Sequence, residues 1–216
     1  MNIITGRYRG ARIVSSARVA RPNSAGRNAG FRPTTGIVRE SIFSVLENVL
    51  DFAGIKVLDL YAGTGALGFE ALSRGAEFAT FVEQSKELAQ CIRETARGIG
   101  IYGELCEVFG TKVEVFCKKA GAINRGVGTE AVGEGRKFRY DLIFSDAPYK
   151  IGDRQEQIAK LIFGAGIVEK RAWWVWECSS DCDVIEEFKF EGVTVKLVKS
   201  KKFGGSSFYV YECEES

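Results

Sequence analysis

The chain has 216 residues, of which 27% are charged and 45% hydrophobic, with a formal net charge of +2 and no histidine. This length suits one domain with a small appendage and is ample for a buried core. The absence of histidine excludes Ser-His-Asp and Cys-His catalysis, His-ligated zinc or haem, and the usual general base near neutral pH. The chemistry must depend on carboxylates, backbone groups, aromatic residues, Lys or Cys, or on a cofactor that brings its own reactivity.

The N-terminal segment differs from the rest of the chain in both charge and periodicity. Residues 2–14 alternate apolar and basic residues around two glycines, which predicts a short hairpin or two edge strands. Residues 15–30 have no periodicity and are expected to form a loop. From Thr35, apolar residues at i, i+3, i+4 and i+7 predict an amphipathic helix. We therefore expect a separate basic arm at residues 1–34 and the main domain at residues 35–216.

From Lys56 onward, predicted strands and helices alternate. Strands are predicted at 56–63 (with its glycine turn), 78–83, 105–110, 140–146 and 172–177, and helices at 66–75, 85–97 and 153–164. Residues 193–200 and 206–212 alternate with period two around KKFGG, which predicts a terminal antiparallel hairpin. The polar, Gly-rich stretch at 121–137 is expected to be an inserted loop. This alternation predicts a parallel, doubly wound α/β sheet.

The positive charge is concentrated in the predicted arm. Residues 1–40 contain eight arginines and one acid, a formal charge of +7, so that the other 176 residues carry −5. A basic arm on an acidic body indicates an anionic partner, and nucleic acid is the common one. The alternative is a solvated tail without a partner.

The cysteines and the apolar segments indicate the compartment. The six cysteines contain no C-x-x-C pair, and without histidine a zinc site is not expected. Several lie in apolar segments, as small reduced side chains in a cytosol would. No secretory signal is visible, and no apolar run approaches the roughly 18 residues that cross a membrane. These features predict a cytoplasmic protein that does not span a membrane.

A glycine motif follows the first strand of the alternating region. Gly63, Gly65 and Gly68 form G-x-G-x-x-G at the start of a predicted helix, a pattern shared by proteins that bind NAD, FAD or S-adenosylmethionine. Glu83, which lies 20 residues after Gly63, ends the next strand, where its carboxylate can accept both ribose hydroxyls. Asp59 favours a ligand with an ammonium group, because it would repel a pyrophosphate. The alternative is that Asp59 caps a helix or turn.

A second motif, Ser145-Asp146-Ala147-Pro148-Tyr149, closes the predicted strand at 140–146. Ligands of open α/β sheets bind outside the carboxyl ends of the strands, so we expect this motif to face the same crevice as the glycines. A carboxylate, a backbone carbonyl and an aromatic ring in one turn suit a planar base with an exocyclic amine. An ordinary strand-end turn is the alternative.

The order of these elements resembles that of the RsmD-type 16S rRNA (guanine-N2)-methyltransferases. The similar stretches cover nearly the whole chain, and the R-P-T-T-x-x-V-R-E segment is far more specific than the glycines. They are residues 3–10 (IITGRYRG), 32–40 and 43, the glycine motif with 71–76 (ALSRGA), the D-x-P-Y turn, and 203–204 with 208–209. Two positions depart from the family. Ala147 replaces the first proline of the usual D-P-P-[FY], and Gly110-Thr111-Lys112 stands where such enzymes commonly carry an acid near the adenine.

The resemblance implies a Rossmann-like class I S-adenosylmethionine-dependent methyltransferase fold. Its mostly parallel seven-stranded sheet would end in an antiparallel hairpin and carry a small N-terminal β-hairpin extension. The implied reaction is methylation of the exocyclic N2 amine of a guanine in 16S rRNA, either naked or in the assembling small ribosomal subunit, by a monomer without a metal. Asp146 and the Ala147 carbonyl would accept hydrogens from the amine, and Tyr149 would stack on the base.

The hypothesis assigns residues to three roles. The catalytic residues are Asp146, Ala147, Pro148 and Tyr149. The cofactor-binding residues are Asp59, Tyr61, Ala62, Gly63, Thr64, Gly65, Glu83, Gln84 and Thr111. The RNA-binding residues are Arg7, Arg9, Arg32, Thr34, Arg39, Lys201 and Lys202, with Arg12 and Lys199 as further candidates.

Three alternatives remain open from the sequence. A nucleotide-dependent oxidoreductase fits the glycine motif and Glu83. A methyltransferase acting on adenine N6 or on a glutamine amide fits the D-x-P-Y turn. An RNA-binding module that has lost its activity fits the departures at Ala147 and Thr111. The aromatic residues Trp173, Trp174 and Trp176 are predicted to belong to the core rather than to a base-binding site.

Overall fold

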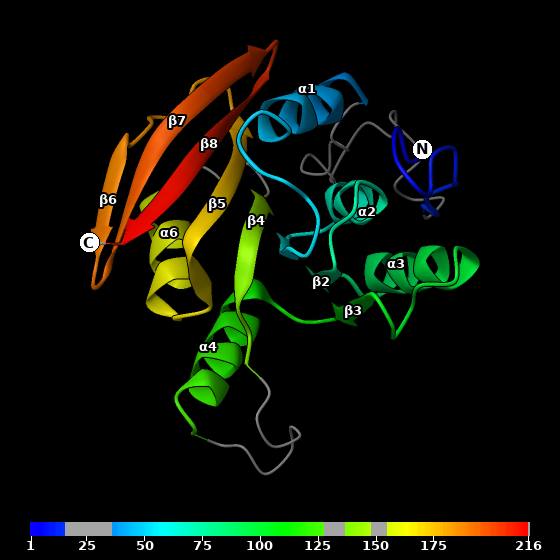
Figure 1. Cartoon of the computed structure of the whole chain (residues 1–216), viewed down its shortest axis with the longest axis horizontal. Helices are drawn as coiled ribbons and strands as arrows, with labels where there is room; N and C mark the ends of the chain where they lie inside the picture. Colours follow the sequence, from blue (N-terminus) through cyan, green and yellow to red (C-terminus); the bar gives the residue numbers. More distant parts are fainter. Residues whose placement is uncertain (16–35, 128–136, 148–154, 216) are drawn as a thin grey trace, which may run out of the picture. The chain divides into compact units, whose positions relative to one another are not determined.

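The structure is a computed structural model that describes residues 1–15, 36–127, 137–147 and 155–215 (Figure 1). These residues divide into two compact units, Met1–Thr111 and Lys112–Ser216, which we describe one at a time. The predicted alternation of strands and helices is present in both.

The first unit is a three-stranded parallel sheet with helices. In chain order it contains α1 (Gly36–Leu46), β1 (Lys56–Leu60), α2 (Ala66–Ser73), β2 (Phe78–Val82), α3 (Lys86–Gly98) and β3 (Cys106–Phe109). The strand order is β3-β2-β1, with Leu60 beside Val82 and Val82 beside Phe109. This register brings the carboxyl ends of all three strands to the same edge, where ligands of such sheets bind.

The second unit combines one parallel strand pair with an antiparallel array. It contains α4 (Val113–Asn124), β4 (Tyr140–Asp146), α6 (Gln155–Gly164), β5 (Val168–Ser179), β6 (Glu187–Phe190), β7 (Val193–Phe203) and β8 (Ser206–Glu215). β4 and β5 run parallel, and β5-β8-β7-β6 are successively antiparallel. The predicted terminal hairpin is confirmed as β7 and β8.

Two elements of the second unit were missed by the sequence prediction. α4 extends to Asn124, so the loop predicted at 121–137 begins inside a helix, and residues 128–136 of that loop lie outside the described residues. The buried residues of α4 recur at helical spacing, beginning with Val113, Phe116 and Cys117. β6 adds a strand before the hairpin. The described residues therefore form eight strands where seven were predicted.

The N-terminal segment packs within the first unit. Residues 2–14 fold back on themselves as the expected short hairpin, with an antiparallel bridge between Asn2 and Arg12. Ile3 N donates to Ala11 O at 3.0 Å, and Ile13 N donates to Met1 O at 2.9 Å. Ile3 and Ile13 are almost fully buried. The boundary between the two units falls after Thr111. The boundary proposed between residues 34 and 35 adjoins the undescribed residues 16–35 and stays a prediction.

The cysteines depart in part from the reduced state that was expected. Cys178 and Cys182 form a disulfide, so the expectation is wrong for this pair, whose separation of four residues is not that of a C-x-x-C motif. The free cysteines in the described residues are all buried. Burial raises the pKa of Cys117 to about 12, so its thiol stays protonated and acts as a small apolar group.

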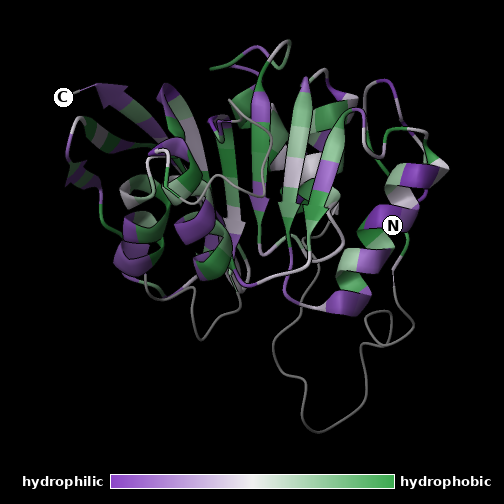
Figure 2. Cartoon of the chain, turned by 90° about the horizontal axis from the view of Figure 1, so that it is seen from below, coloured by the Kyte–Doolittle hydropathy of each residue, from purple (hydrophilic) through white to green (hydrophobic). Residues whose placement is uncertain are grey.

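Apolar strands and amphipathic helices form the core of each unit. In Figure 2, the central strands are mainly hydrophobic, and the helices carry both hydrophobic and hydrophilic residues. Trp174 and Trp176 are fully buried, which confirms them as core residues, whereas Trp173 is half-buried. No helix among the residues that the structure describes is long and apolar enough to cross a membrane.

Replacing Trp174 by alanine is expected to destabilise the protein by about 3–5 kcal/mol, because the substitution leaves a large cavity. The Trp174 ring lies 5.0 Å from that of Tyr211 and 5.7 Å from that of Phe163, and its Nε1 donates to Ser145 Oγ at 2.8 Å. Trp173→Ala is the matched control and should cost about 1 kcal/mol. Urea unfolding followed by far-ultraviolet circular dichroism measures both, and equal losses would contradict this account.

Candidate functional site

The chain leaves β1 through a turn of left-handed backbone. Tyr61 (φ 56°), Gly63 (φ 57°) and Gly65 (φ 76°) all have positive φ, and Gly65 stands at the N-cap of α2 without a side-chain cap. Tyr61 is the only non-glycine residue with positive φ among the described residues. Such backbone costs about 1 kcal/mol or more for a side-chain-bearing residue, and it concentrates at functional sites.

Two buried carboxylates hold this turn through its backbone N–H groups. Glu83 accepts from Gly63 N at 2.8 Å and from Ser85 N at 2.7 Å. Asp59 Oδ2 accepts from Gly68 N at 3.0 Å. Asp59 and Glu83 are 2% and 7% exposed, so their charges are stabilised by these donors more than by water.

The contact between Asp59 and Gly68 bears on the role of Asp59. Gly68 is the third residue of α2, and the first four N–H groups of a helix have no partner within it. Asp59 supplies that partner from the neighbouring strand, as the capping alternative predicted. Its contact with a ligand ammonium group stays a prediction.

Gly68 also sets how closely α2 approaches β2. A Cβ added at Gly68 would lie 2.3 Å from Cε1 of Phe81 and 3.1 Å from Oδ2 of Asp59. The Phe69 and Phe81 rings pack beside it, 4.8 Å apart. The third glycine of the motif is therefore required by packing between helix and strand.

Burial raises the pKa of Glu83 above its ordinary value, whereas the N–H groups of Ser85, Gly63 and Gln84 act in the opposite direction. The backbone donors thus hold the Glu83 carboxylate in place, although burial disfavours its ionised form. A ligand hydroxyl that donates to it would favour the ionised form.

The remaining cofactor candidates lie at the same edge of the first unit. Ala62 N donates to Val82 O at 3.1 Å, which ties the turn to the end of β2. Thr64 is buried, Gln84 is exposed, and Thr111 is half-buried just beyond β3. The strand register therefore places the candidates after β1, β2 and β3 at one edge of the first unit, and their roles in cofactor binding stay predictions.

The candidate catalytic turn belongs to the second unit. Asp146 ends β4 and is half-buried, and Ala147 is 4% exposed. Pro148 and Tyr149 lie outside the described residues. Asp146 stands beside Glu177 of β5 in the strand register. The roles proposed for this turn stay predictions.

The RNA-binding candidates fall into three groups. Arg7, Arg9 and Arg12 are exposed in the N-terminal segment, and Lys199, Lys201 and Lys202 are exposed on β7. Arg32 and Thr34 lie outside the described residues. Arg39 is 2% exposed, and the structure corrects its assignment as an RNA contact.

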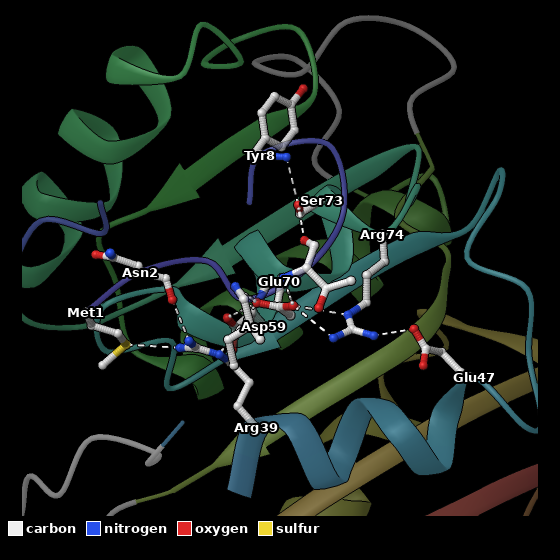
Figure 3. Close-up of polar contacts among 12 residues, drawn as sticks. Met1, Asn2, Tyr8, Arg39, Glu47, Asp59, Glu70, Ser73 and Arg74 are labelled. Carbon is white, nitrogen blue, oxygen red and sulfur yellow. Dashed lines mark hydrogen bonds and ion pairs between the residues drawn. The ribbon is translucent and has the colours of Figure 1, made fainter. Parts of the chain in front are cut away.

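Arg39 belongs to a buried ion-pair network around Glu70, shown in Figure 3. Its Nη2 donates to Asn2 O at 2.6 Å, and its Nε lies 3.6 Å from Glu70 Oε2. Arg74 donates to the other Glu70 oxygen at 3.0 Å and also pairs with Glu47. Arg39 therefore packs α1 against α2 and the N-terminal segment, because it is the counter-ion of a buried acid.

Glu70 and Ser73 were not identified from the sequence. The visible signal was Glu70 itself, the one charged residue in the apolar helix ALGFEALS, all of which is buried. A lone acid inside a buried helix requires counter-ions, and Arg39 of α1 and Arg74, which follows α2, were the available candidates.

Known proteins share this fold. A solved structure described as the putative methyltransferase yhhF from Escherichia coli matches 100% of this chain and 99% of its own, with a TM-score of 0.73 and 24% identity. The fold is therefore that of class I S-adenosylmethionine-dependent methyltransferases, which confirms the predicted fold class.

Sequence comparison then defines the family. The family model described as Conserved hypothetical protein 95 matches residues 1–212, and the chain belongs to this family. A curated relative, Ribosomal RNA small subunit methyltransferase D of Buchnera aphidicola subsp. Acyrthosiphon pisum, is 28% identical over 201 residues, which cover 88% of this chain and 90% of that protein. The family resemblance drawn from the sequence is confirmed.

Another relative matches over a shorter stretch. The uncharacterized methylase RP545 of Rickettsia prowazekii is 39% identical over 89 residues, which cover 38% of this chain and only 34% of that protein. The similarity to this relative is therefore confined to about a third of its length.

We expect Gly68→Ala to lower stability by about 1–3 kcal/mol, because the added methyl group overpacks the contact with Phe81. The same change should displace Asp59 and weaken ligand binding at the glycine turn. Gly98→Ala is the control, because Gly98 is also helical and has no atom within 4 Å of an added Cβ. Thermal unfolding of both variants tests this, and equal stability would show that the close approach is unimportant.

Proposed function

We propose that the protein is an S-adenosylmethionine-dependent rRNA methyltransferase that methylates the N2 amine of a guanine in small-subunit rRNA. The family, the fold and the name of the Buchnera relative support methylation of rRNA. The guanine target rests on the resemblance of nearly the whole chain, including its R-P-T-T-x-x-V-R-E segment, to RsmD-type enzymes. We propose the cytoplasm as its location, where ribosomal subunits assemble.

The choice of cofactor rests on one observation: the N–H groups of the glycine motif already donate to acceptors within the protein. Gly63 N and Gly68 N donate to the carboxylates of Glu83 and Asp59, and Gly65 N donates to Ala62 O at 2.7 Å. A dinucleotide site needs such N–H groups for its pyrophosphate and would not place two carboxylates on them. An ammonium group and a ribose diol are donors, and carboxylates suit both. The donor set therefore fits S-adenosylmethionine and disfavours the oxidoreductase alternative.

In this proposal the cofactor supplies a methyl group already activated by its sulfonium. Glu83 accepts hydrogen bonds from the ribose hydroxyls, and Asp59 offers negative charge to the ammonium group. Asp146 and the Ala147 carbonyl accept from the guanine N2 amine and orient its lone pair, while Tyr149 stacks on the base. Orientation of a weak nucleophile is the main contribution of the protein, and it needs no histidine.

Asp146→Ala is expected to lower the rate of methyl transfer by about 10²-fold or more, because the amine loses its orienting acceptor. S-adenosylmethionine affinity, measured by calorimetry, should stay unchanged. Asp141→Ala is the matched control, since Asp141 is also a half-buried acid on β4 and stands at the opposite end of the strand. Transfer of labelled methyl groups to small subunits that lack the modification measures the rate. Full activity in Asp146→Ala would overturn the proposed catalytic role.

The same labelled subunits identify the target. Mapping the methylated nucleotide should give a guanine carrying an N2 methyl group. Label on an adenine N6 or on a glutamine of a protein would replace the guanine assignment. Cofactor binding without transfer to naked rRNA or to subunits would favour the RNA-binding module, and binding of NAD in place of S-adenosylmethionine would favour the oxidoreductase.

S-adenosylmethionine affinity is expected to fall as the pH is lowered from neutral towards about pH 5. Burial raises the pKa of Glu83 above its ordinary value, so its carboxylate protonates earlier on acidification than that of an exposed glutamate. A protonated Glu83 loses acceptor strength for the ribose hydroxyls. Calorimetric titrations across this range should show the loss, and Glu83→Gln should bind more weakly with a flatter pH profile. An identical pH profile in the two proteins would contradict the assignment.

A further inference from the structure

The last turn of α2 binds the first residues of the chain. Both oxygens of Glu70 accept from successive backbone N–H groups, at 2.8 Å from Ile4 N and 3.0 Å from Thr5 N. Ser73 O accepts from Arg7 N at 2.7 Å, and Ser73 Oγ accepts from Tyr8 N at 2.9 Å, as Figure 3 shows in part. The backbone of residues 4–8, which we call the N-terminal turn, is thereby fixed on one helix.

The charge of Glu70 is balanced within the same cluster. Its side chain is 0% exposed, and the guanidinium groups of Arg39 and Arg74 lie 3.6 Å and 3.0 Å from its two oxygens. A buried carboxylate is tolerated only where counter-ions and donors satisfy it. Removing the N-terminal turn would leave both oxygens short of donors, so the turn and the ion pairs depend on each other.

Gly6 shows how closely the N-terminal turn lies on α2. Its φ is +86°, and a Cβ added there would lie 1.8 Å from Ser73 O, far inside any contact distance. Gly10 has a similar φ of +82°, and an added Cβ there would meet no atom within 4 Å. Gly6 and Gly10 therefore have nearly the same backbone conformation, and they differ in that only Gly6 lies against α2.

The N-terminal turn carries two exposed arginines close to these contacts. Arg7 follows Gly6 directly and donates its backbone N–H to Ser73, while its side chain is exposed, and the side chain of Arg9 is exposed as well. A cation held on a fixed backbone loses less conformational entropy when it binds a phosphate than one on a free chain.

We propose that Glu70 and Ser73 are positioning residues that dock the N-terminal turn on α2 and thereby present Arg7 and Arg9 to rRNA phosphates. This inference rests on the proposed function and adds a specific RNA-binding surface to it. Because α2 begins at the glycine turn and ends at Ser73, the same helix orients the candidate cofactor site and the candidate RNA surface.

The test compares Gly6→Ala with Gly10→Ala in the full-length protein. Both substitutions carry a similar cost of positive φ, but only Gly6→Ala collides with Ser73. Gly6→Ala should speed amide hydrogen exchange at Thr5, Arg7 and Tyr8 and weaken binding of a small-subunit rRNA fragment by about tenfold, and the slope of log K against log salt should fall by roughly one to two units. Gly10→Ala should change none of these, and S-adenosylmethionine affinity should stay the same in both.

A second set of variants distinguishes the loss of correctly placed arginines from a general destabilisation of the protein. In an Arg7→Ala/Arg9→Ala background, adding Gly6→Ala should cause no further loss of rRNA affinity, because the displaced cations are already absent. Ser73→Ala, which keeps the backbone acceptor, should give a smaller loss than Gly6→Ala. Additive losses would overturn the inference.

The docking inference and the proposed function fail through different measurements. If Gly6→Ala shows faster hydrogen exchange but unchanged rRNA affinity, docking does not present Arg7 and Arg9 to rRNA. The proposal of methyl transfer would be unaffected by that result. Unchanged hydrogen exchange would overturn the docking itself. A wild-type protein that neither binds rRNA nor methylates small subunits would overturn the proposed function, and the role of the N-terminal turn in RNA binding with it.

Discussion

Buried carboxylates that accept backbone N–H groups determine the local structure of the first unit. Asp59 and Glu83 hold the glycine turn at the start of α2, and Glu70 holds the N-terminal turn near its end. Each acid is nearly inaccessible to water, so each would be costly without the donors that it has. The backbone at both ends of one eight-residue helix is thus fixed by acids rather than by regular secondary structure.

This arrangement explains how a chain without histidine can build a binding site. Carboxylates are acceptors when ionised, and the glycine turn offers donors that orient them without neutralising them. The backbone N–H groups of Gly63 and Ser85 oppose the effect of burial on the pKa of Glu83. The result is an acceptor surface that matches a ligand rich in donors, and the same acids would repel a phosphate. Because the carboxylates of Glu83 and Asp59 already accept from the glycine N–H groups, the turn favours S-adenosylmethionine over a dinucleotide.

The sequence predicted the elements whose residues repeat with a clear period, and it failed where contacts come from distant parts of the chain. The strands and helices around Gly63 and Glu83 were found because apolar periodicity and the glycines act locally. α4 was missed because its glycine and polar residues near Asn124 resemble a loop. Arg39 was misassigned because a charged residue in a basic segment gives no sign of the buried Glu70 that pairs with it 31 residues later.

The buried ion pairs around Glu70 also reduce the positive charge that the N-terminal segment can offer to a partner. The formal +7 of residues 1–40 counts Arg39 as if it faced solvent, although its charge is balanced by Glu70 inside the first unit. Among the described residues of the arm, the exposed positive side chains are Arg7, Arg9 and Arg12. The proposed RNA surface is therefore defined by which cations the fold leaves exposed, and the buried Arg39 contributes by holding in place the segment that carries them. A motif can be specific to a family because it builds the scaffold of a site, and Arg39 in the R-P-T-T-x-x-V-R-E segment fits that explanation.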